Sequence, residues 1–273
     1  MLRAYYAHSH LQQVEKPGTG DDTRSWGPPF VQGESTYFMS VNRNKKSLSL
    51  DLKSPSGVEV IRRLARISDV VVENFVPGTT KALGIDYDTL RRENEGLIYA
   101  SITGFGQDGP RSTHRGYDLM LSALGGLMSV TGEADGPPMK VGVALTDVIT
   151  GLWTQSAISS ALLCRHKTGK GSLIECSLLD AQVASLVHFA SGFLNAGSPG
   201  RRSGTAHPSI APYQAFITSD GYVTLGANNQ EQWERLCEVL SLPDLKSHPH
   251  FATNADRVSH REELAGILQE KFK

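Results

Sequence analysis

Short apolar runs alternate with stretches of helical periodicity through the first half of the chain. The apolar runs predict three strands, over residues 47–52 (SLSLDL), 69–75 (DVVVENF) and 97–105 (LIYASITGF). A helix is predicted from Pro55 onward, where apolar residues recur at helical spacing, and a shorter helix over 86–94. Strands that alternate with helices predict βαβ units around a parallel sheet. The β-branched run at 69–75 is typical of a strand that is buried on both faces.

The second half of the chain contains longer helical segments and then a hairpin. The sequence predicts helices over 117–132, 147–169 and 179–197, a strand over 172–178, a hairpin over 213–227, and helices near 229–240 and 256–271. Gly125 and Gly126 interrupt the first of these helices, and such glycines usually mark close packing against another backbone. We therefore predict an α/β fold, with a Rossmann-like parallel-sheet domain over 1–218 and the start of a smaller α+β domain over 219–273.

Composition narrows the class of protein. The chain has 273 residues, a net charge of -1 and 39% hydrophobic residues, which is ordinary for a folded globular protein. No overall positive charge attracts nucleic acid or an anionic membrane, and no apolar run reaches the length of about 18 residues that spans a bilayer. The cysteines Cys164, Cys176 and Cys237 are widely spaced, which indicates a reducing compartment and gives no metal-site pattern.

Three segments predict irregular structure. Residues 1–13 contain Arg3 and no acidic residue, which fits either an organelle-targeting peptide or a frayed terminus. Residues 14–36 are rich in Gly, Pro, Asp and Ser and predict a long loop, and residues 201–216 predict a second one that leads into the hairpin. Long loops in compact domains often carry function.

Asp147 lies where a small-residue apolar run, VGVAL, meets a segment of helical periodicity. One interpretation is structural: Thr146 or Asp147 caps the helix and complements its dipole. The other is chemical: the helix N-terminus keeps Asp147 ionised, and the small residues before it leave room for a substrate carbonyl. Carboxylates act as nucleophiles in covalent catalysis.

Two further groups of candidates follow predicted strands. Leu50–Lys53 and Asn74–Val76 lie at the carboxyl ends of two predicted strands. Open α/β sheets bind ligands at these strand ends. Lys53 could contact a phosphate, although a salt-bridged lysine and a turn-forming Asn74 are equally good interpretations. The sequence has no GxGxxG motif and no Walker A loop, which argues against a standard dinucleotide or nucleoside triphosphate site.

Isolated candidates complete the set. Arg115 could bind a carboxylate or phosphate, and Tyr117 could line a pocket, but a surface arginine and a core tyrosine are common alternatives. His207 and Tyr213 lie in the second predicted loop region with no other histidine spaced for metal binding.

Taken together, several stretches resemble the class III CoA-transferases, the CaiB/BaiF or formyl-CoA transferase family. The similar stretches are GDDTRSWGPPF, NRNKKSLSLDLKSPSG, DVVVENFVPG, YASITGFGQDGP, GYDLMLSALGGLMSVTG, VALTDVITG, RHKTGKG and GTAHPSIAPYQAF. The resemblance extends from about residue 14 to the end, and its closest branch uses succinyl-CoA and glutarate. It implies a CoA-transferase that moves CoA from an acyl-CoA to a carboxylic acid, such as a dicarboxylate.

The resemblance also implies roles for individual residues. Asp147 would be the catalytic aspartate, forming first an aspartyl anhydride and then an aspartyl-CoA thioester in a dry pocket that stabilises an oxyanion. The stretches implied to line the CoA site contain Leu50, Asp51, Leu52, Lys53, Asn74, Phe75, Val76, Arg115 and Tyr117. No metal and no tightly bound cofactor is implied, because the CoA thioester is the substrate. The family forms an interlocked ring-like homodimer, and the implied location is mitochondrial, or otherwise cytoplasmic.

Departures from the family pattern suggest alternatives. Ala82 stands where one family arginine contacts CoA, so phosphate contacts should differ. The related α-methylacyl-CoA racemases have a GHD motif where this chain has Tyr117 in GYD, and a tyrosine of ordinary pKa is a poor base at neutral pH. The family's first βα unit and its C-terminal part have no counterpart here. We therefore also expect, as an alternative, an inactive truncated form that only binds or pairs.

Overall fold

A computed structural model describes residues 11–272, and they divide into two compact units. The first unit comprises the described residues up to Leu127 together with Val141–Ser191, and the second comprises Met128–Lys140 together with the residues from Gly192 onward. The expected boundary at residue 219 instead falls inside a hairpin of the second unit. The targeting pattern expected within residues 1–13 lies almost wholly outside the described residues.

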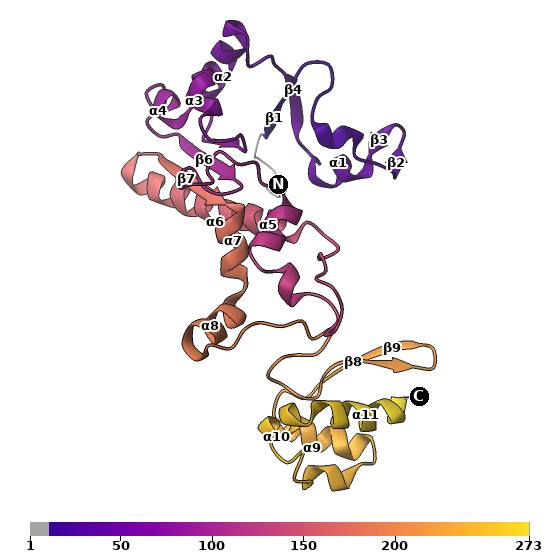
Figure 1. Cartoon of the computed structure of the whole chain (residues 1–273). Coiled ribbons are helices and arrows are strands. Elements are labelled where there is room, and N and C mark those ends of the chain that lie inside the picture. Colours follow the sequence, from indigo (N-terminus) through magenta and orange to yellow (C-terminus); the bar gives the residue numbers. More distant parts are fainter. Residues whose placement is uncertain (1–10, 273) are drawn as a thin grey trace. The chain divides into compact units, whose positions relative to one another are not determined.

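The first unit is built around a parallel sheet of three strands (Figure 1). The order is β5 (Val70–Glu73), β6 (Ile98–Thr103) and β7 (Ser172–Ser177). β6 is central and nearly all buried, which confirms the predicted α/β class with a parallel sheet. β5 pairs only with β6 among the described strands, and Val72 is 52% exposed, so the expected burial of this strand on both faces is wrong.

The strand predicted at 47–52 belongs to a different sheet. β4 (Lys46–Ser49) pairs in parallel with β1 (Gln12–Glu15), a strand that lies within the segments predicted to be irregular. Glu15 is buried and accepts hydrogen bonds from Arg24 Nε at 2.8 Å and Nη2 at 2.9 Å. This contact lowers the pKa of Glu15 to about 2. An ion pair between the buried Glu15 and the partly exposed Arg24 therefore stabilises this region, and no hydrophobic pattern predicts it.

The predicted loop over 14–36 is also more regular than expected. It contains three short elements and leads into a helix: η1 (Asp22–Ser25), β2 (Phe30–Val31), β3 (Glu34–Ser35) and α1 (Thr36–Val41). Ser35 caps α1, since its Oγ accepts the N–H groups of Tyr37 and Phe38. Elements this short bury few side chains and leave no periodicity to detect.

The first unit also contains several helices, and some of them match the prediction. Their bounds are α2 (Pro55–Ile67), α3 (Thr79–Leu83), α4 (Tyr87–Leu90), α5 (Asp118–Leu124), α6 (Leu145–Thr168) and α7 (Leu178–Ser185). Ser54 caps α2, with its Oγ accepting the N–H of Gly57 at 3.1 Å. The helix expected over 117–132 ends at Leu124, because Gly126 adopts a φ of 92° that stops it. A turn, η2 (Met128–Val130), follows.

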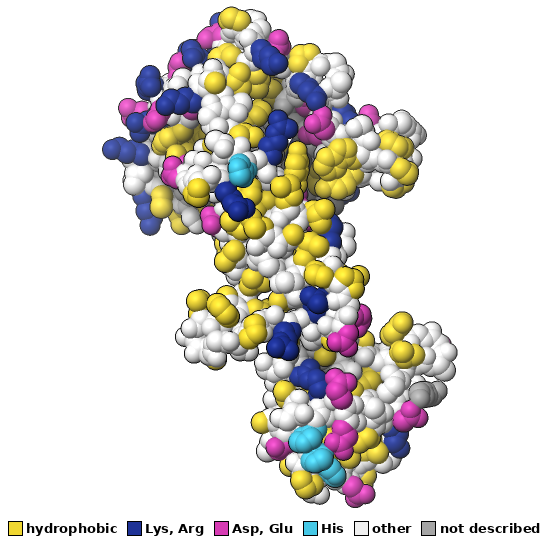
Figure 2. Space-filling model, viewed as in Figure 1, with side chains coloured by type: hydrophobic (Ala, Val, Ile, Leu, Met, Phe, Trp, Pro, Cys, Tyr) yellow, Lys and Arg dark blue, Asp and Glu magenta, His cyan; other side chains and the backbone are white. Residues whose placement is uncertain are grey.

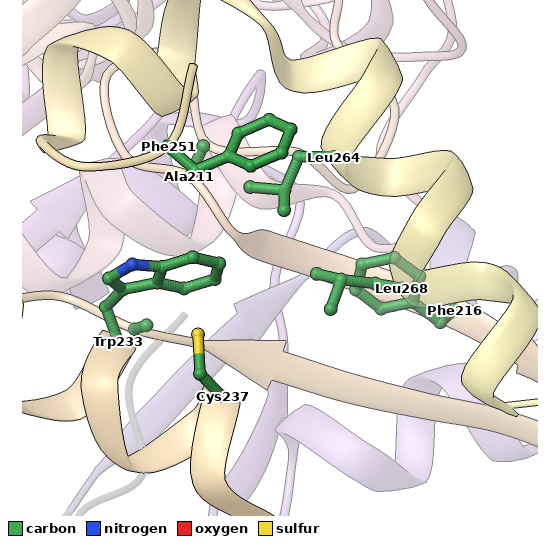
Figure 3. Packing of buried hydrophobic residues seen from close by; sticks show 8 residues of the cluster. Ala211, Phe216, Trp233, Cys237, Phe251, Leu264 and Leu268 are labelled. Carbon is green, nitrogen blue, oxygen red and sulfur yellow. The ribbon is translucent and has the colours of Figure 1, made fainter. Parts of the chain in front are cut away.

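The second unit packs a hairpin against helices. Its elements are α8 (Val187–Ala196, which begins in the first unit), β8 (Tyr213–Thr218), β9 (Gly221–Gly226), α9 (Gln230–Val239), η3 (Pro243–Lys246), α10 (Asn254–Ser259) and α11 (Arg261–Phe272). Figure 3 shows the apolar core between them, with Trp233 and Phe251 fully buried. Arg257 is buried in the same unit. Its guanidinium donates hydrogen bonds to the carbonyl oxygens of Ala211 at 2.7 Å and Phe251 at 2.9 Å.

Three sequence expectations concern the chain as a whole. No helix in the described residues is long and apolar enough to cross a membrane. Cys164, Cys176 and Cys237 are all free thiols. Within residues 11–272, no group of three or more His, Cys, Asp or Glu side chains could hold a metal ion.

Replacing Gly125 by alanine should destabilise the first unit by about 1–3 kcal/mol. A Cβ at this position would lie 2.5 Å from Cγ of the buried Gln182, so the expected close packing is present, although against a side chain. The φ of Gly125 is -78°, which alanine adopts freely, so the expected loss is steric. Urea denaturation measures it.

Gly142→Ala is the matched control, because a Cβ there meets nothing within 4 Å. Equal midpoints for the Gly125→Ala variant and the unsubstituted chain would contradict the packing argument.

Candidate active site

The start of α6 is held by a side chain from α5. Asp118 is buried, and its Oδ2 accepts the backbone N–H of Thr146 at 2.9 Å and of Asp147 at 3.4 Å. The expectation that Thr146 or Asp147 caps the helix is therefore wrong, since Ala144 occupies the cap position and makes no side-chain bond. The capping carboxylate comes instead from 28 residues earlier in the chain.

A buried polar network fixes the first turn of α6. Thr146 is fully buried, and its Oγ1 donates to Oε1 of Gln182 on α7 at 2.7 Å. The hydroxyl oxygen of Ser122 on α5 lies 2.8 Å from the same Oγ1 and forms a hydrogen bond with it. Three helices therefore meet at Thr146, and these hydrogen bonds fix the position of the next residue, Asp147.

Asp147 itself is exposed and forms no ion pair with a described lysine or arginine. Although Asp147 is exposed, surrounding protein atoms partly desolvate its carboxylate. This partial desolvation, and next the negative charge of Asp118, raise the pKa of Asp147 above its ordinary value. The surroundings thus work against the helix dipole and make the carboxylate more basic than a free aspartate.

A tyrosine from α1 lies in the same electrostatic environment. Burial first, and then the charges of Asp147 and Asp118, raise the pKa of Tyr37, so its hydroxyl stays protonated at neutral pH. The charges of both carboxylates therefore act on the Tyr37 hydroxyl, which keeps a proton that it can donate. The sequence did not indicate it, because it follows a segment that was predicted to be a loop.

The backbone of the first helical turn is fully engaged. Leu145 N–H donates to the carbonyl oxygen of Val143 at 2.9 Å, Val148 N–H donates to that of Ala144 at 3.0 Å, and the two intervening N–H groups face Asp118. The N-terminus of α6 therefore has no vacant N–H group for an oxyanion.

One hollow collects part of the predicted CoA-binding set. It has a volume of about 370 Å³ and is lined by Leu52, Lys53, Pro55, Val58, Glu59, Arg62, Ala82 and Leu83. Leu52 and Lys53 are predicted site residues, and Ala82 is the position where a different phosphate contact was expected. Asp51 forms the turn beside them, with its Oδ1 accepting the N–H of Lys53 at 2.9 Å. Leu50 precedes this turn and donates its N–H to the carbonyl oxygen of Glu15 at 2.9 Å.

The second predicted stretch leads from β5 into α3 but does not line this hollow. Asn74 and Phe75 are exposed, Val76 is half-buried, and the N–H of Phe75 donates to Oε2 of Glu73 at 2.7 Å. Glu73 is a further titratable group at this strand end, and burial raises its pKa.

Arg115 lines a separate hollow of about 700 Å³, together with Arg111, His114, Phe105, Met120, Ala123 and Leu124. Tyr117 does not line it. This tyrosine occupies the cap position of α5, with 59% of its surface exposed, directly before the capping Asp118. Tyr117 is therefore next in sequence to the residue whose side chain holds the start of α6, while Arg115 and Lys53 line different hollows.

His207 and Tyr213 belong to the second unit and interact with each other. Their ring centroids are 5.4 Å apart, and the N–H of His207 donates to the carbonyl oxygen of Tyr213 at 2.9 Å. This contact supports a structural role for both residues.

Comparison with known proteins assigns the family. The sequence profile of CoA-transferase family III matches residues 12–273. The chain belongs to this family. Among its relatives, the human protein named "Succinyl-CoA:glutarate CoA-transferase" is 50% identical over 260 residues, which is 95% of this chain and 59% of that protein. The Agrobacterium fabrum protein named "Succinate--glutarate CoA-transferase" is 45% identical, over 94% of this chain and 66% of its own length.

A solved structure supports the same assignment at the level of fold. A CaiB/BaiF family protein from Brucella suis is 44% identical and superposes with a TM-score of 0.84, covering 97% of this chain and 71% of that one. The family resemblance inferred from the sequence is therefore confirmed. This family III chain spans about three fifths to two thirds of the length of the curated relatives described above.

Proposed function

We propose that this chain acts as a CoA-transferase that moves CoA from succinyl-CoA to a dicarboxylate such as glutarate, with Asp147 as the nucleophile. The names of the human and Agrobacterium relatives support the substrate pair. The observation that carries the proposal is the state of Asp147. It is exposed, paired with no described cation, raised in pKa, and held at the start of a helix by Asp118.

The reaction proceeds by exchange at carbonyl carbons. An Asp147 oxygen attacks the thioester carbonyl, the carbon–sulfur bond breaks, and CoA leaves as a thiolate, which produces a mixed anhydride. The thiolate then attacks the aspartyl carbonyl, releasing succinate and leaving an aspartyl-CoA thioester. The acceptor carboxylate attacks this thioester, the carbon–sulfur bond breaks, and CoA leaves again as a thiolate, which produces a second anhydride. CoA thiolate finally attacks the acceptor's carbonyl, which releases the new acyl-CoA and free Asp147.

A basic carboxylate suits the first step. Nucleophilicity rises with basicity, so the raised pKa of Asp147 favours attack as long as the group remains ionised. Since the first N–H groups of α6 already have acceptors, the donors that stabilise the oxyanion belong to other groups. Tyr37 is a candidate donor, because its hydroxyl is protonated and lies in the electrostatic field of Asp147.

The CoA moiety is proposed to bind along Leu50, Asp51, Leu52, Lys53, Asn74, Phe75, Val76, Arg115 and Tyr117. Lys53 and Arg115 supply positive charge for phosphate, and Leu52 supplies apolar contact. No metal and no resident cofactor takes part in this scheme.

A homodimer is also part of the proposal. Large apolar side chains are exposed on α5 and α6, including Leu119, Met120, Leu152 and Trp153. Figure 2 shows hydrophobic side chains at the surface over the region of α5. Exposed apolar surface of this kind often marks an interface. Light scattering coupled to size exclusion tests it, and a monomeric mass at micromolar concentration would contradict it.

Location follows the family resemblance. We propose a mitochondrial location on the basis of that resemblance and of Arg3 with no acidic residue in the first 13 positions. Imaging of the chain with a C-terminal fluorescent tag tests this, and a diffuse cytoplasmic signal would contradict it.

The activity is tested with succinyl-CoA and a panel of acceptor acids, using the purified 273-residue chain. Formation of glutaryl-CoA from succinyl-CoA and glutarate is the expected result. An absence of every acyl-CoA product would support the inactive binding form. Exchange of an α-proton of a 2-methylacyl-CoA in deuterated water, without CoA transfer, would support racemase activity instead.

A further inference from the structure

The hollow beside α2 is lined by a positively charged side chain, Arg62, that the sequence analysis did not select as a candidate. Lys53 lines one side of it, and Arg62 of α2 contributes a second positive charge to the same lining. The remaining lining is mainly apolar, from Leu52, Pro55, Val58, Ala82 and Leu83. α2 and α3, which supply most of these residues, lie next to each other in Figure 1. Its volume, about 370 Å³, is within the range of small-ligand pockets.

Neither Lys53 nor Arg62 forms an ion pair with a described carboxylate. In the described part of the chain, no carboxylate lies within 4.0 Å of the Lys53 or Arg62 nitrogens. The acidic member of the lining, Glu59, is paired with Arg63 at 3.0 Å. The lining therefore has a local excess of positive charge against an apolar wall, which suits a phosphorylated ligand.

Arg62 is held in place by the neighbouring helix. Its Nη2 and Nε donate to the carbonyl oxygen of Gly84 at 3.2 and 3.4 Å, at the end of α3. These bonds are long and go to one oxygen, so other N–H groups of the guanidinium remain available. A fixed, planar guanidinium binds phosphate through two parallel bonds more readily than a flexible lysine does.

We propose that Arg62, together with Lys53, binds a phosphoryl group of the nucleotide part of CoA. The proposal rests on the proposed CoA-transferase function and extends it, because Arg62 was not among the residues expected to contact CoA. Ala82 belongs to the same lining and contributes only a methyl group, so a larger side chain does not occupy the hollow from this position.

The test is isothermal titration calorimetry with three ligands: CoA, dephospho-CoA, which lacks the 3′-phosphate, and pantetheine, which lacks the whole nucleotide. Arg62→Ala should weaken CoA binding about tenfold and leave pantetheine binding unchanged. If the variant also binds dephospho-CoA normally, Arg62 contacts the 3′-phosphate. If dephospho-CoA is weakened as much as CoA, Arg62 contacts the pyrophosphate.

Matched variants separate binding from charge and folding. Arg66→Ala removes the same charge from the same helix, but Arg66 pairs with Glu93 at 2.7 Å and does not line the hollow, so CoA binding should remain within twofold. Glu59→Gln removes the negative charge from the lining and should tighten CoA binding. Arg62→Lys keeps the charge without the planar fork and should give an intermediate affinity, which retains the test if Arg62→Ala unfolds.

Two outcomes would overturn the proposal while leaving the function intact: normal CoA affinity in Arg62→Ala, or equal weakening of CoA and pantetheine. Failure of the unsubstituted chain to bind CoA at all would instead count against the proposed function, so the two failures are distinguishable.

Discussion

Replacing Asp147 by asparagine should reduce the CoA-transfer rate at least about a thousandfold, since the substituted side chain has no carboxylate to form the anhydride. The measurement is kcat for glutaryl-CoA formation, followed by chromatography of the acyl-CoA products. Asp147→Ala should give the same loss. Retention of more than a tenth of the activity in either variant would exclude Asp147 as the nucleophile.

Asp147→Asn should leave the fold intact and the free energy of unfolding unchanged or slightly higher. The pKa of Asp147 is raised in the folded chain, so the folded state binds its proton more tightly than the unfolded state does. Stability from this group is present at low pH and is lost as the pH rises from about 3.9 through the raised folded pKa. At neutral pH the charged group therefore opposes folding, and Asp147→Asn removes that effect. A large fall in Tm would mean that the lost activity reflects unfolding.

Covalent chemistry at Asp147 has its own expected signature. Hydroxylamine cleaves activated carboxyl groups, so incubation with succinyl-CoA and hydroxylamine should convert Asp147 to a hydroxamate, visible by peptide mass spectrometry. The reaction without succinyl-CoA is the control. Labelling of another carboxylate, with Asp147 unmodified, would assign the nucleophile elsewhere.

The sequence predicted the framework where local patterns are strong. Ser54 and Pro55 define the start of α2, and the apolar run around Ala100 became the buried central strand β6. These features depend on neighbours in sequence or on continuous apolarity, which a single sequence displays directly. The family resemblance then led us to propose Asp147 as the nucleophile, whereas local patterns alone would have explained it as a helix cap.

The predictions failed where distant polar contacts decide the structure. The bond between Asp118 and the start of α6 joins residues 28 positions apart, and no periodicity reveals it. Glu15 and Arg24 connect the region around β1 and β4 through a partly buried ion pair. Arg62 belongs to a helix whose pattern was read only for its apolar face, so its place in the hollow beside Lys53 became visible only in three dimensions.

Asp118 is expected to act as a positioning residue for Asp147. Its Oδ2 accepts the N–H groups of Thr146 and Asp147, so Asp118→Ala leaves a buried helix start without its acceptor. We expect a loss of about 1–2 kcal/mol in stability and a fall of about a hundredfold in kcat, because a carboxylate that moves by about 1 Å attacks poorly. Denaturation and the transfer assay measure the two effects.

Asp118→Asn separates position from charge, because its amide oxygen can still accept these bonds. The charge of Asp118 raises the pKa of Asp147, so removing that charge lowers the pKa and shifts the acid limb of the pH–activity profile to lower pH. Asp86→Asn is the matched control. Asp86 caps α4 in a similar way, with Oδ1 accepting the N–H of Thr89 at 2.7 Å, but it does not touch α6 and should leave the acid limb in place. An unshifted limb in Asp118→Asn would mean that Asp118 acts on Asp147 only by holding the helix, because a purely structural role does not alter when the nucleophile ionises.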